Sequence, residues 1–228
     1  MYQVHQPVLY HEIIHALCPK SEGLYVDGTL GSGGHAFGIL EASSPGGLLL
    51  GLDVDPQALE IAHKTLAPYR ERTYIKRASY TDLANQISNL GWQSVDGILL
   101  DLGASSMQFD TPERGFSFLT DGPLDMRFDS SASLDASQVI NFWSEGELAD
   151  LIYQYGEEPT SRRIARAIVA ARPIEGTRHL AEVIERTLPR SRSIHPATRT
   201  FQALRIVVNR ELDAIKLALP ISVQALGS

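Results

Sequence analysis

A glycine-rich stretch near the N-terminus carries the residues best suited to hold a nucleotide-like ligand. Residues 31–36, Gly-Ser-Gly-Gly-His-Ala, satisfy the loose dinucleotide pattern G-x-G-x-x-G/A, and Asp53 follows Gly31 by 22 residues, near the position of a ribose-binding carboxylate. A dinucleotide would place its diphosphate at the start of the next helix, where Asp27, four residues before Gly31, would repel it. S-adenosylmethionine (SAM) has no phosphate, and its ammonium and sulfonium groups are cationic. Asp27 therefore favours SAM over a nicotinamide cofactor.

The glycines and the acidic residues of this region have distinct expected roles. Gly31, Gly33 and Gly34 would let the backbone approach the ligand closely. Asp53 could accept hydrogen bonds from both ribose hydroxyls. Asp55 precedes a proline at the start of a helical pattern, so we interpret it as the N-cap of that helix and not as a ligand contact.

Four further residues are candidates for the same site, each with an alternative. His35 could contact the ligand or simply begin the helix. Tyr80 could flank an adenine, although an aromatic side chain at this place also fits ordinary packing. Asp101 and Gln108 offer acceptor and amide groups suited to a ligand or to a base edge, and the alternative for Asp101 is that it closes a turn.

The elements that must position these residues alternate between strand and helix. Apolar runs predict strands over 23–26, 48–54, 74–76 and 95–102, and helical spacing predicts helices from 36, over 56–66 and over 83–90. This alternation is typical of a parallel, doubly wound α/β sheet. Ligands bind such sheets outside the carboxyl ends of the strands, where the candidate residues fall.

The second half of the chain has a different character. Residues 105–135 are rich in Gly, Pro, Asp and Ser and predict an ordered loop at a site, and helical patterns follow from 139 onward. One of these covers 161–171, and another runs from near Pro196 in steps of three and four until Pro220.

Arginine is concentrated in this second half. Residues 160–210 hold 11 Arg and 3 Glu, a balance of +8, whereas the whole chain has a net charge of -7. Guanidinium groups are always charged and can grip two phosphate oxygens at once. The segment therefore favours a nucleic-acid partner, and a solvated helical surface would explain the composition equally well.

Length and composition exclude several classes of protein. A chain of 228 residues with 43% apolar and 21% charged residues allows one large domain, or one domain with an insertion, and is too apolar for an extended disordered chain. No apolar run approaches a bilayer span, and Cys18 as the only cysteine excludes an intrachain disulfide and a cysteine-based zinc cluster. We expect a protein of the reducing cytoplasm, without membrane insertion, and we expect no metal, because His5, His11 and His15 lack a carboxylate partner pattern.

Seven motifs in order resemble the MraW-type SAM-dependent methyltransferases, which modify the exocyclic N4 of a cytosine in bacterial small-subunit (16S) ribosomal RNA. They extend from residue 5 to about 219 and comprise His5-Gln6-Pro7-Val8-Leu9 and residues 27–35, 95–103, 113–118, 121–127, 163–168 and 195–206. The resemblance implies a Rossmann-like class I methyltransferase sheet with an inserted helical subdomain for RNA. It also implies SAM contacts at Gly33, Gly34, His35, Asp53, Tyr80, Asp101 and Gln108. At the position of Tyr80 the family has an aromatic residue, commonly Phe.

The resemblance also organises the chain into segments. We expect a SAM-binding core over 1–134, a helical RNA-recognition insertion over 135–205 and a helix returning to the core over 206–228. The arginines that we expect to contact RNA are Arg162, Arg163, Arg166, Arg199 and Arg205. The family continues with a Pro-Gly-Gly turn, further strands and a Ser-Phe-His-Ser-Leu-Glu-Asp-Arg segment. We therefore expect a C-terminally truncated piece of a longer reading frame, whose fourth strand has an unpaired edge.

The predicted reaction is methyl transfer from SAM to cytosine N4 in the 16S rRNA of the 30S subunit. Asp101 is the candidate catalytic residue, because its carboxylate could accept a hydrogen from the N4 amino group, although a purely SAM-binding role fits equally well. The base must be unstacked, and Phe116 or Phe118 could stack on it or lie in the core. The alternatives are a noncatalytic RNA-binding ribosome-assembly protein and an NAD-dependent oxidoreductase, which Asp27 disfavours.

Overall fold

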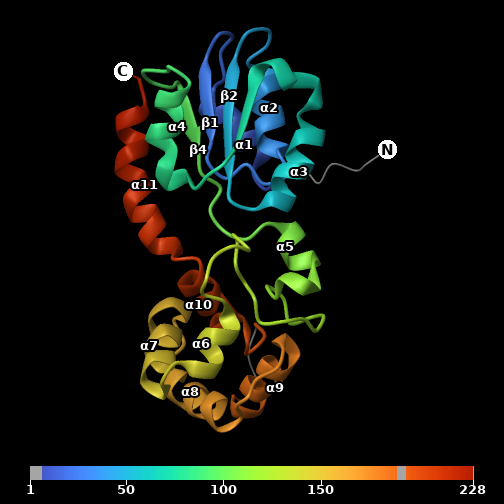
Figure 1. Cartoon of the computed structure of the whole chain (residues 1–228), viewed down its shortest axis with the longest axis vertical. Helices are drawn as coiled ribbons and strands as arrows, with labels where there is room; N and C mark the ends of the chain where they lie inside the picture. The colour runs from blue at the N-terminus through green and yellow to red at the C-terminus, as the bar shows by residue number, and fades with distance from the viewer. Residues whose placement is uncertain (1–6, 189–193, 228) are drawn as a thin grey trace. The chain divides into compact units, whose positions relative to one another are not determined.

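The computed structural model describes residues 7–188 and 194–227 (Figure 1). His5 and Gln6 of the first motif, together with Arg190 and Arg192, lie outside the described residues. The chain forms two compact units: unit 1 comprises residues up to Gly103 and from Asp213 onward, and unit 2 comprises Ala104–Leu212. Each unit has its own core and is described by itself.

Unit 1 is built on a parallel four-stranded sheet. Its strands are β1 (Leu24–Asp27), β2 (Leu48–Asp53), β3 (Thr73–Arg77) and β4 (Gly97–Leu99), in the spatial order β3-β2-β1-β4. The helices between them are α1 (Tyr10–Leu17), α2 (Gly34–Ala42), α3 (Pro56–Thr65) and α4 (Leu83–Asn89), with the 3₁₀ helices η1 (Ala67–Arg72) and η2 (Tyr80–Asp82). The predicted α/β class is confirmed, and the fourth strand pairs with the first. The fourth strand is shorter than the predicted run 95–102.

Helices cover both faces of the sheet, as Figure 1 shows. Successive strand residues point to opposite faces, so Tyr25 packs with α1, α2 and α3, while Val26 packs with α4 and the last helix, α11 (Glu211–Ala225). Both side chains are at most 1% exposed. Burial on both faces explains why β1 and β2 are nearly continuous apolar runs.

The outer side of β4 meets residues from the end of the described chain. Val95 makes a parallel bridge with Leu226: its N–H donates to the carbonyl of Ala225 (2.9 Å), and the N–H of Gly227 donates to its carbonyl (3.0 Å). Part of the expected open edge is therefore paired just before β4 begins.

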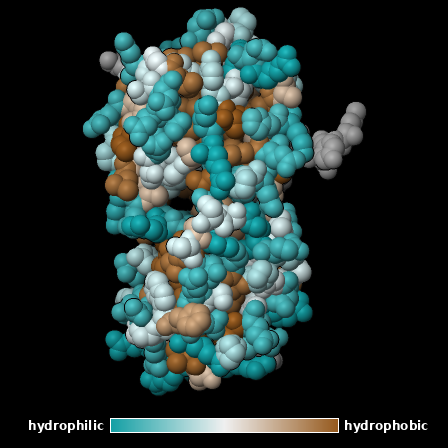
Figure 2. Space-filling view, in the orientation of Figure 1, coloured by the Kyte–Doolittle hydropathy of each residue, from teal (hydrophilic) through white to brown (hydrophobic). Residues whose placement is uncertain are grey.

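Unit 2 is a helical unit around one apolar core. Its elements are α5 (Ser106–Asp110), η3 (Pro112–Arg114), α6 (Ala136–Phe142), α7 (Glu145–Gly156), α8 (Ser161–Ala170), α9 (Thr177–Thr187) and α10 (Thr198–Val208). On α8, Ile164 and Ile168 are fully buried one turn apart, while Arg162, Arg163 and Arg166 are exposed. Figure 2 shows hydrophilic side chains over most of the visible surface of each unit, which agrees with apolar residues gathered inside.

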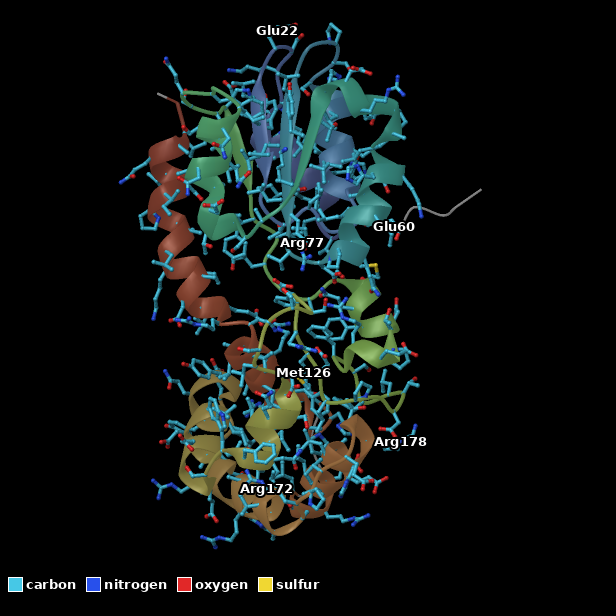
Figure 3. The ribbon with its side chains drawn as sticks, in the orientation of Figure 1. Glu22, Glu60, Arg77, Met126, Arg172 and Arg178 are labelled. Atoms are coloured by element: carbon cyan, nitrogen blue, oxygen red, sulfur yellow. The ribbon has the colours of Figure 1, made fainter. Side chains whose placement is uncertain are left out.

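The loop 104–134 belongs to unit 2, which differs from the expected boundary at 134/135. Phe116, Leu124 and Met126 are each at most 5% exposed and join the helical core, because the loop contributes apolar side chains that this core encloses. Figure 3 labels Met126 within unit 2. Phe116 is thus a core residue, and Phe118 packs partly buried against the same core.

The prediction of one helix from near Pro196 to Pro220 is wrong in two respects. α10 ends at Val208, and Arg210 has a left-handed backbone (φ +49°), so the chain turns before α11 begins. The side-chain amide of Asn209 explains the break, because it donates to the carbonyl of Met126 (2.7 Å) and accepts from the N–H of Phe128 (2.7 Å). Pro220 lies inside α11 and does not end it.

Candidate active site

The first element of the site is the end of β1 and the loop that follows it. Asp27, the last residue of β1, is 1% exposed and accepts a hydrogen bond from the N–H of Thr29 (3.1 Å). The loop is tied to both neighbouring strands, since Gly28 donates to the carbonyl of Leu99 (2.9 Å) and Leu30 donates to that of Leu52 (2.9 Å). The two strands that flank β1, β2 and β4, therefore fix the position of the Asp27 carboxylate.

Two glycines of the loop have backbones that other residues rarely adopt. Gly31 has φ +51° and Gly33 has φ +84°. A Cβ at Gly33 would lie 3.2 Å from Cγ of Leu66, so the space there is also tight. Gly33 is the N-cap of α2 without a side-chain hydrogen bond to the first turn, which leaves the N-terminal N–H groups of α2 for a ligand. Gly34 and His35 form that first turn.

Asp53, the last residue of β2, holds the glycine loop from the next strand. One carboxylate oxygen accepts from the N–H of Gly31 (2.7 Å) and the other from the N–H of Asp55 (2.9 Å). Each oxygen can accept more than one hydrogen bond, so the carboxylate keeps capacity for ribose hydroxyls. Asp55 caps α3 by accepting from the N–H of Gln57 (3.0 Å), with Pro56 in the first turn, which confirms its predicted structural role.

Tyr80 and Asp101 belong to the same end of the sheet. A Cβ at Gly28 would lie 3.0 Å from Cβ of Tyr80, which places the start of that side chain against the β1 loop. Asp101 follows β4, and its side chain is 57% exposed. Its N–H donates to the hydroxyl oxygen of Thr29 (2.7 Å), so Thr29 links the backbone of Asp101 to the carboxylate of Asp27.

His35 is buried in this site with unsatisfied nitrogens. It is 6% exposed, and its ring is stacked with that of Tyr10 (6.2 Å between centroids). Neither ring nitrogen has a hydrogen-bond partner within residues 7–188 and 194–227. Its Nε2 lies 3.6 Å from a carboxylate oxygen of Asp101. Burial lowers the pKa of His35 below 6.5, although Asp101 opposes this shift. The imidazole is therefore neutral at pH 7 and can serve a bound ligand.

Carboxylates dominate the electrostatics of this strand end. The pKa of Asp27 is raised from 3.8 to about 7, chiefly by burial, with a further contribution from the charges of Asp53 and Asp101. Burial also raises the pKa of Asp53. A cationic ligand would favour the ionised forms of these groups, whereas a diphosphate would not. The donor set thus fits SAM: three carboxylates, the first-turn N–H groups of α2 behind the glycine loop, and an imidazole whose nitrogens have no hydrogen-bond partner among the described residues.

Gln108 lies in unit 2 and already has a structural role. Its carboxamide oxygen accepts from the N–H of Ser105 (3.1 Å), and its own N–H donates to the Ser105 hydroxyl (3.4 Å), which forms the capping box of α5. Its predicted contact with SAM stays a prediction.

The five candidate RNA-binding arginines differ in what engages them. Arg205 pairs through two nitrogens with Glu211 (2.8 and 3.1 Å), and Arg199 donates to the carbonyl of Glu157 (2.8 Å). Arg166 lies 3.5 Å from Glu145. The side chains of Arg162 and Arg163 are exposed and make no ion pair or hydrogen bond with the residues that the structure describes. All five stay candidates for RNA binding. Arg162 and Arg163 are the two whose guanidinium groups would not have to give up a contact within the described residues in order to bind a phosphate.

Sequence reasoning did not identify Thr29 and Tyr10 as parts of the site. Thr29 lies between Asp27 and Gly31 in the motif. Its position in the loop after the first strand could have indicated that its hydroxyl links two strand ends. Nothing in the spacing of Tyr10 indicates its stacking on His35, since 25 residues separate them. Over the described ranges, no cluster of three or more potential metal ligands occurs, and no helix has the length and apolar character needed to span a bilayer.

A parallel α/β sheet with acidic strand ends around a glycine loop defines a Rossmann-like, SAM-dependent methyltransferase. The chain matches the MraW methylase family over residues 2–228 and belongs to that family. It is similar to the ribosomal RNA small subunit methyltransferase H of Syntrophus aciditrophicus, with 51% identity over 96% of this chain and 71% of that protein. The protein of the same name from Geotalea uraniireducens is 50% identical over 97% of this chain and 73% of its own length.

Solved structures include a weaker likeness. The O-methyltransferase from Bacillus cereus in complex with SAH matches with 17% identity and a TM-score of 0.35, over 73% of this chain and 69% of that chain. This TM-score is too low to carry an inference.

Family membership assigns SAM as the cofactor and rejects the nicotinamide alternative. SAM supplies an electrophilic methyl group. The residues of unit 1 that would hold it are Asp27, Asp53, Tyr80, Asp101 and His35 with the glycine loop 31–34, and these assignments are proposals.

Proposed function

We propose that this protein transfers a methyl group from SAM to the exocyclic N4 of a cytosine in small-subunit ribosomal RNA, with the 30S particle as its substrate. The carboxylate cluster of Asp27, Asp53 and Asp101 is the observation that carries the choice of a cationic methyl donor. The names of the two relatives support ribosomal RNA of the small subunit as the acceptor. The choice of cytosine N4 rests on the resemblance of the seven motifs.

The N4 amino group is a poor nucleophile because its lone pair is delocalised into the ring. The protein must therefore hold the amino group in line with the reactive methyl, and positioning of this kind is worth up to ~7–11 kcal/mol of barrier. Asp101 suits this task, since its half-exposed carboxylate can accept a hydrogen bond from N4. The same carboxylate can accept the proton that N4 loses when it is methylated.

Recognition of RNA falls to unit 2 in this proposal. Its segment 160–210 carries a balance of +8, and Arg162, Arg163 and Arg166 present exposed guanidinium groups on one helix. Arginines bind phosphates through paired N–H groups. A target cytosine must leave its stack for its amino group to react, so we expect the substrate to be a loop or a single-stranded segment.

The test is methyl transfer from isotope-labelled SAM to 30S particles that lack the modification. After digestion of the rRNA to nucleosides, mass spectrometry against standards separates N4-methylcytidine from 5-methylcytidine and 2′-O-methylcytidine. We expect N4-methylcytidine, and label in another nucleoside would refute the proposed acceptor atom. RNA binding without any transfer would instead support the noncatalytic assembly protein.

Asp101→Asn separates the two roles of Asp101. The amide keeps the shape of the side chain but cannot accept the proton, so we expect a large fall in transfer rate with SAM affinity retained within a few fold. Equal losses of SAM affinity and of transfer rate would show that Asp101 binds SAM and would contradict its role as the proton acceptor.

A further inference from the structure

A surface hollow of unit 2 lies between α7 and the first turn of α8. It has a volume of about 370 Å³, and its lining includes Tyr153 and Asp150 from α7 and Ser161, Arg162 and Arg163 from α8. Sites for small ligands commonly span about 300–1,000 Å³, so the hollow is large enough for a single nucleotide.

The charge of the hollow suits a phosphate group. Arg162 and Arg163 both line it, and their guanidinium groups make no ion pair or hydrogen bond with the described part of the chain. Asp150 is the one carboxylate among the lining residues, so the two arginines leave a positive balance. α8 also begins here without a side-chain cap, and the N-terminus of a helix adds partial positive charge.

Tyr153 gives the hollow an aromatic side. This side chain is 65% exposed, although Leu151 and Ile152 beside it on α7 are buried in the core. Exposed aromatic rings beside positive charge are the elements with which proteins bind single-stranded nucleic acids, because bases stack on the rings while arginines hold the backbone.

The turn that joins the two helices is held firmly. Glu158 is 0% exposed, and its carboxylate accepts from the N–H of Thr160 (2.9 Å) and lies 3.7 Å from a guanidinium nitrogen of Arg199. Ser161 is also buried at the start of α8. The arginines of the hollow therefore project from a fixed backbone, which reduces the entropy lost on binding.

We infer that this hollow binds one unpaired nucleotide of the RNA substrate, with its base stacked on Tyr153 and its phosphates held by Arg162 and Arg163. This inference rests on the proposed function, in which RNA is the acceptor. It adds Tyr153 to the RNA-binding residues, and it separates the two arginines of the hollow from Arg199 and Arg205, which are engaged within unit 2.

The test measures binding of a fluorescein-labelled single-stranded cytidine dodecamer to the full chain by fluorescence anisotropy, between ~50 and ~200 mM KCl. Tyr153→Ala should weaken binding at least about fivefold by loss of stacking, with an unchanged salt dependence, and Tyr153→Phe should restore affinity. The double variant Arg162→Ala/Arg163→Ala should lower the slope of log K against log salt by about 1.4, since each phosphate contact on a single strand contributes ~0.7.

Arg186→Ala is the control, because Arg186 is also an exposed arginine of unit 2 but lies on α9, outside the hollow, and is paired with Glu182 (3.1 Å). It should bind the dodecamer like the wild type. Wild-type affinity and slope in the hollow variants would overturn the inference, as would no binding of the dodecamer by the wild type. A hexaglutamate peptide that binds the wild type more tightly than the dodecamer, and loses affinity in the double variant, would assign the hollow to an acidic peptide and also overturn it.

Methyl transfer to 30S particles distinguishes this inference from the proposed function. If the wild type transfers the methyl group but the hollow variants bind the dodecamer normally, only the hollow is refuted. If the hollow variants lose binding as expected but the wild type transfers nothing, the proposed function fails and the hollow still stands as an RNA site.

Discussion

Replacement of Asp27 by Asn should make the ligand-free protein more stable and a poorer binder of SAM. Asp27 is 1% exposed, and one oxygen of its carboxylate accepts hydrogen bonds from the N–H (3.1 Å) and the hydroxyl (3.5 Å) of Thr29. An asparagine oxygen can accept the same two bonds, so the change removes a buried charge and keeps the contacts and the volume. The ionised carboxylate is useful only when a cation lies beside it.

The size of the expected gain in stability follows from the pKa of Asp27, which folding raises from 3.8 to about 7. Each tenfold change in proton affinity corresponds to ~1.4 kcal/mol, so the buried charge costs the folded state at most about 4 kcal/mol. Because the pKa of Asp27 is higher in the folded than in the unfolded protein, its contribution to the free energy of unfolding is fully present below pH 3.8, where the carboxyl group is protonated in both states. This contribution is lost progressively as the pH rises, and the loss is complete above pH 7.

The assay is urea unfolding of both proteins, followed by circular dichroism without SAM, at several values between pH 4 and pH 8. The difference in free energy of unfolding, variant minus wild type, should grow with pH toward about 4 kcal/mol. Carboxylates far from Asp27 titrate alike in both proteins, so the difference reports Asp27 together with its electrostatic coupling to Asp53 and Asp101. Calorimetry at pH 8 should show SAM affinity reduced at least about tenfold, the scale of one charge-assisted hydrogen bond. Parallel stability curves for the two proteins would refute the reasoning.

Three further predictions concern the framework of the two units. Gly33→Ala, with φ +84° and a new Cβ 3.2 Å from Leu66, should cost about 1–3 kcal/mol in urea unfolding and weaken SAM binding in calorimetry. Asn209→Ala should cost about 2–4 kcal/mol and speed amide hydrogen exchange over 126–128, because two hydrogen bonds to that backbone are lost; unchanged exchange there would contradict the role of Asn209. Ile164→Ala removes a fully buried side chain and should cost about 2–5 kcal/mol in urea unfolding, whereas Arg163→Ala on the exposed side of the same helix should cost little.

The sequence predicts unit 1 well because local signals and tertiary structure agree there. Short apolar runs bounded by glycine favour strands buried on two faces, and Asp55 directly before a proline favours the cap of the helix that follows, as the structure has it. Asp27 and Asp53 end two strands and Asp101 follows a third, so a parallel sheet must gather them at one edge. Position along the chain was sufficient to find these side chains.

Unit 2 was harder because its determining contacts are distant in sequence. Asn209 ends α10 by binding backbone atoms more than 80 residues earlier, and no local pattern reports such a partner. Phe116 gives no sign in its neighbours of whether it faces solvent or a core. Helical periodicity continued across the break at Arg210 because both helices have an apolar side.

The ligands proposed for the two units have opposite charges, so the two units need binding surfaces of opposite sign. A negative net charge of the whole chain is therefore no argument against an RNA partner. The strand ends of unit 1 gather carboxylates because the donor is a cation, and one of these carboxylates is buried deeply enough to raise its pKa to about 7. The segment 160–210 gathers arginines, as a polyanionic acceptor requires, and its balance of +8 is hidden by -15 in the rest of the chain. A net charge near -7 is therefore compatible with binding of RNA, since association depends on the local field of the binding surface and not on the sum over the chain.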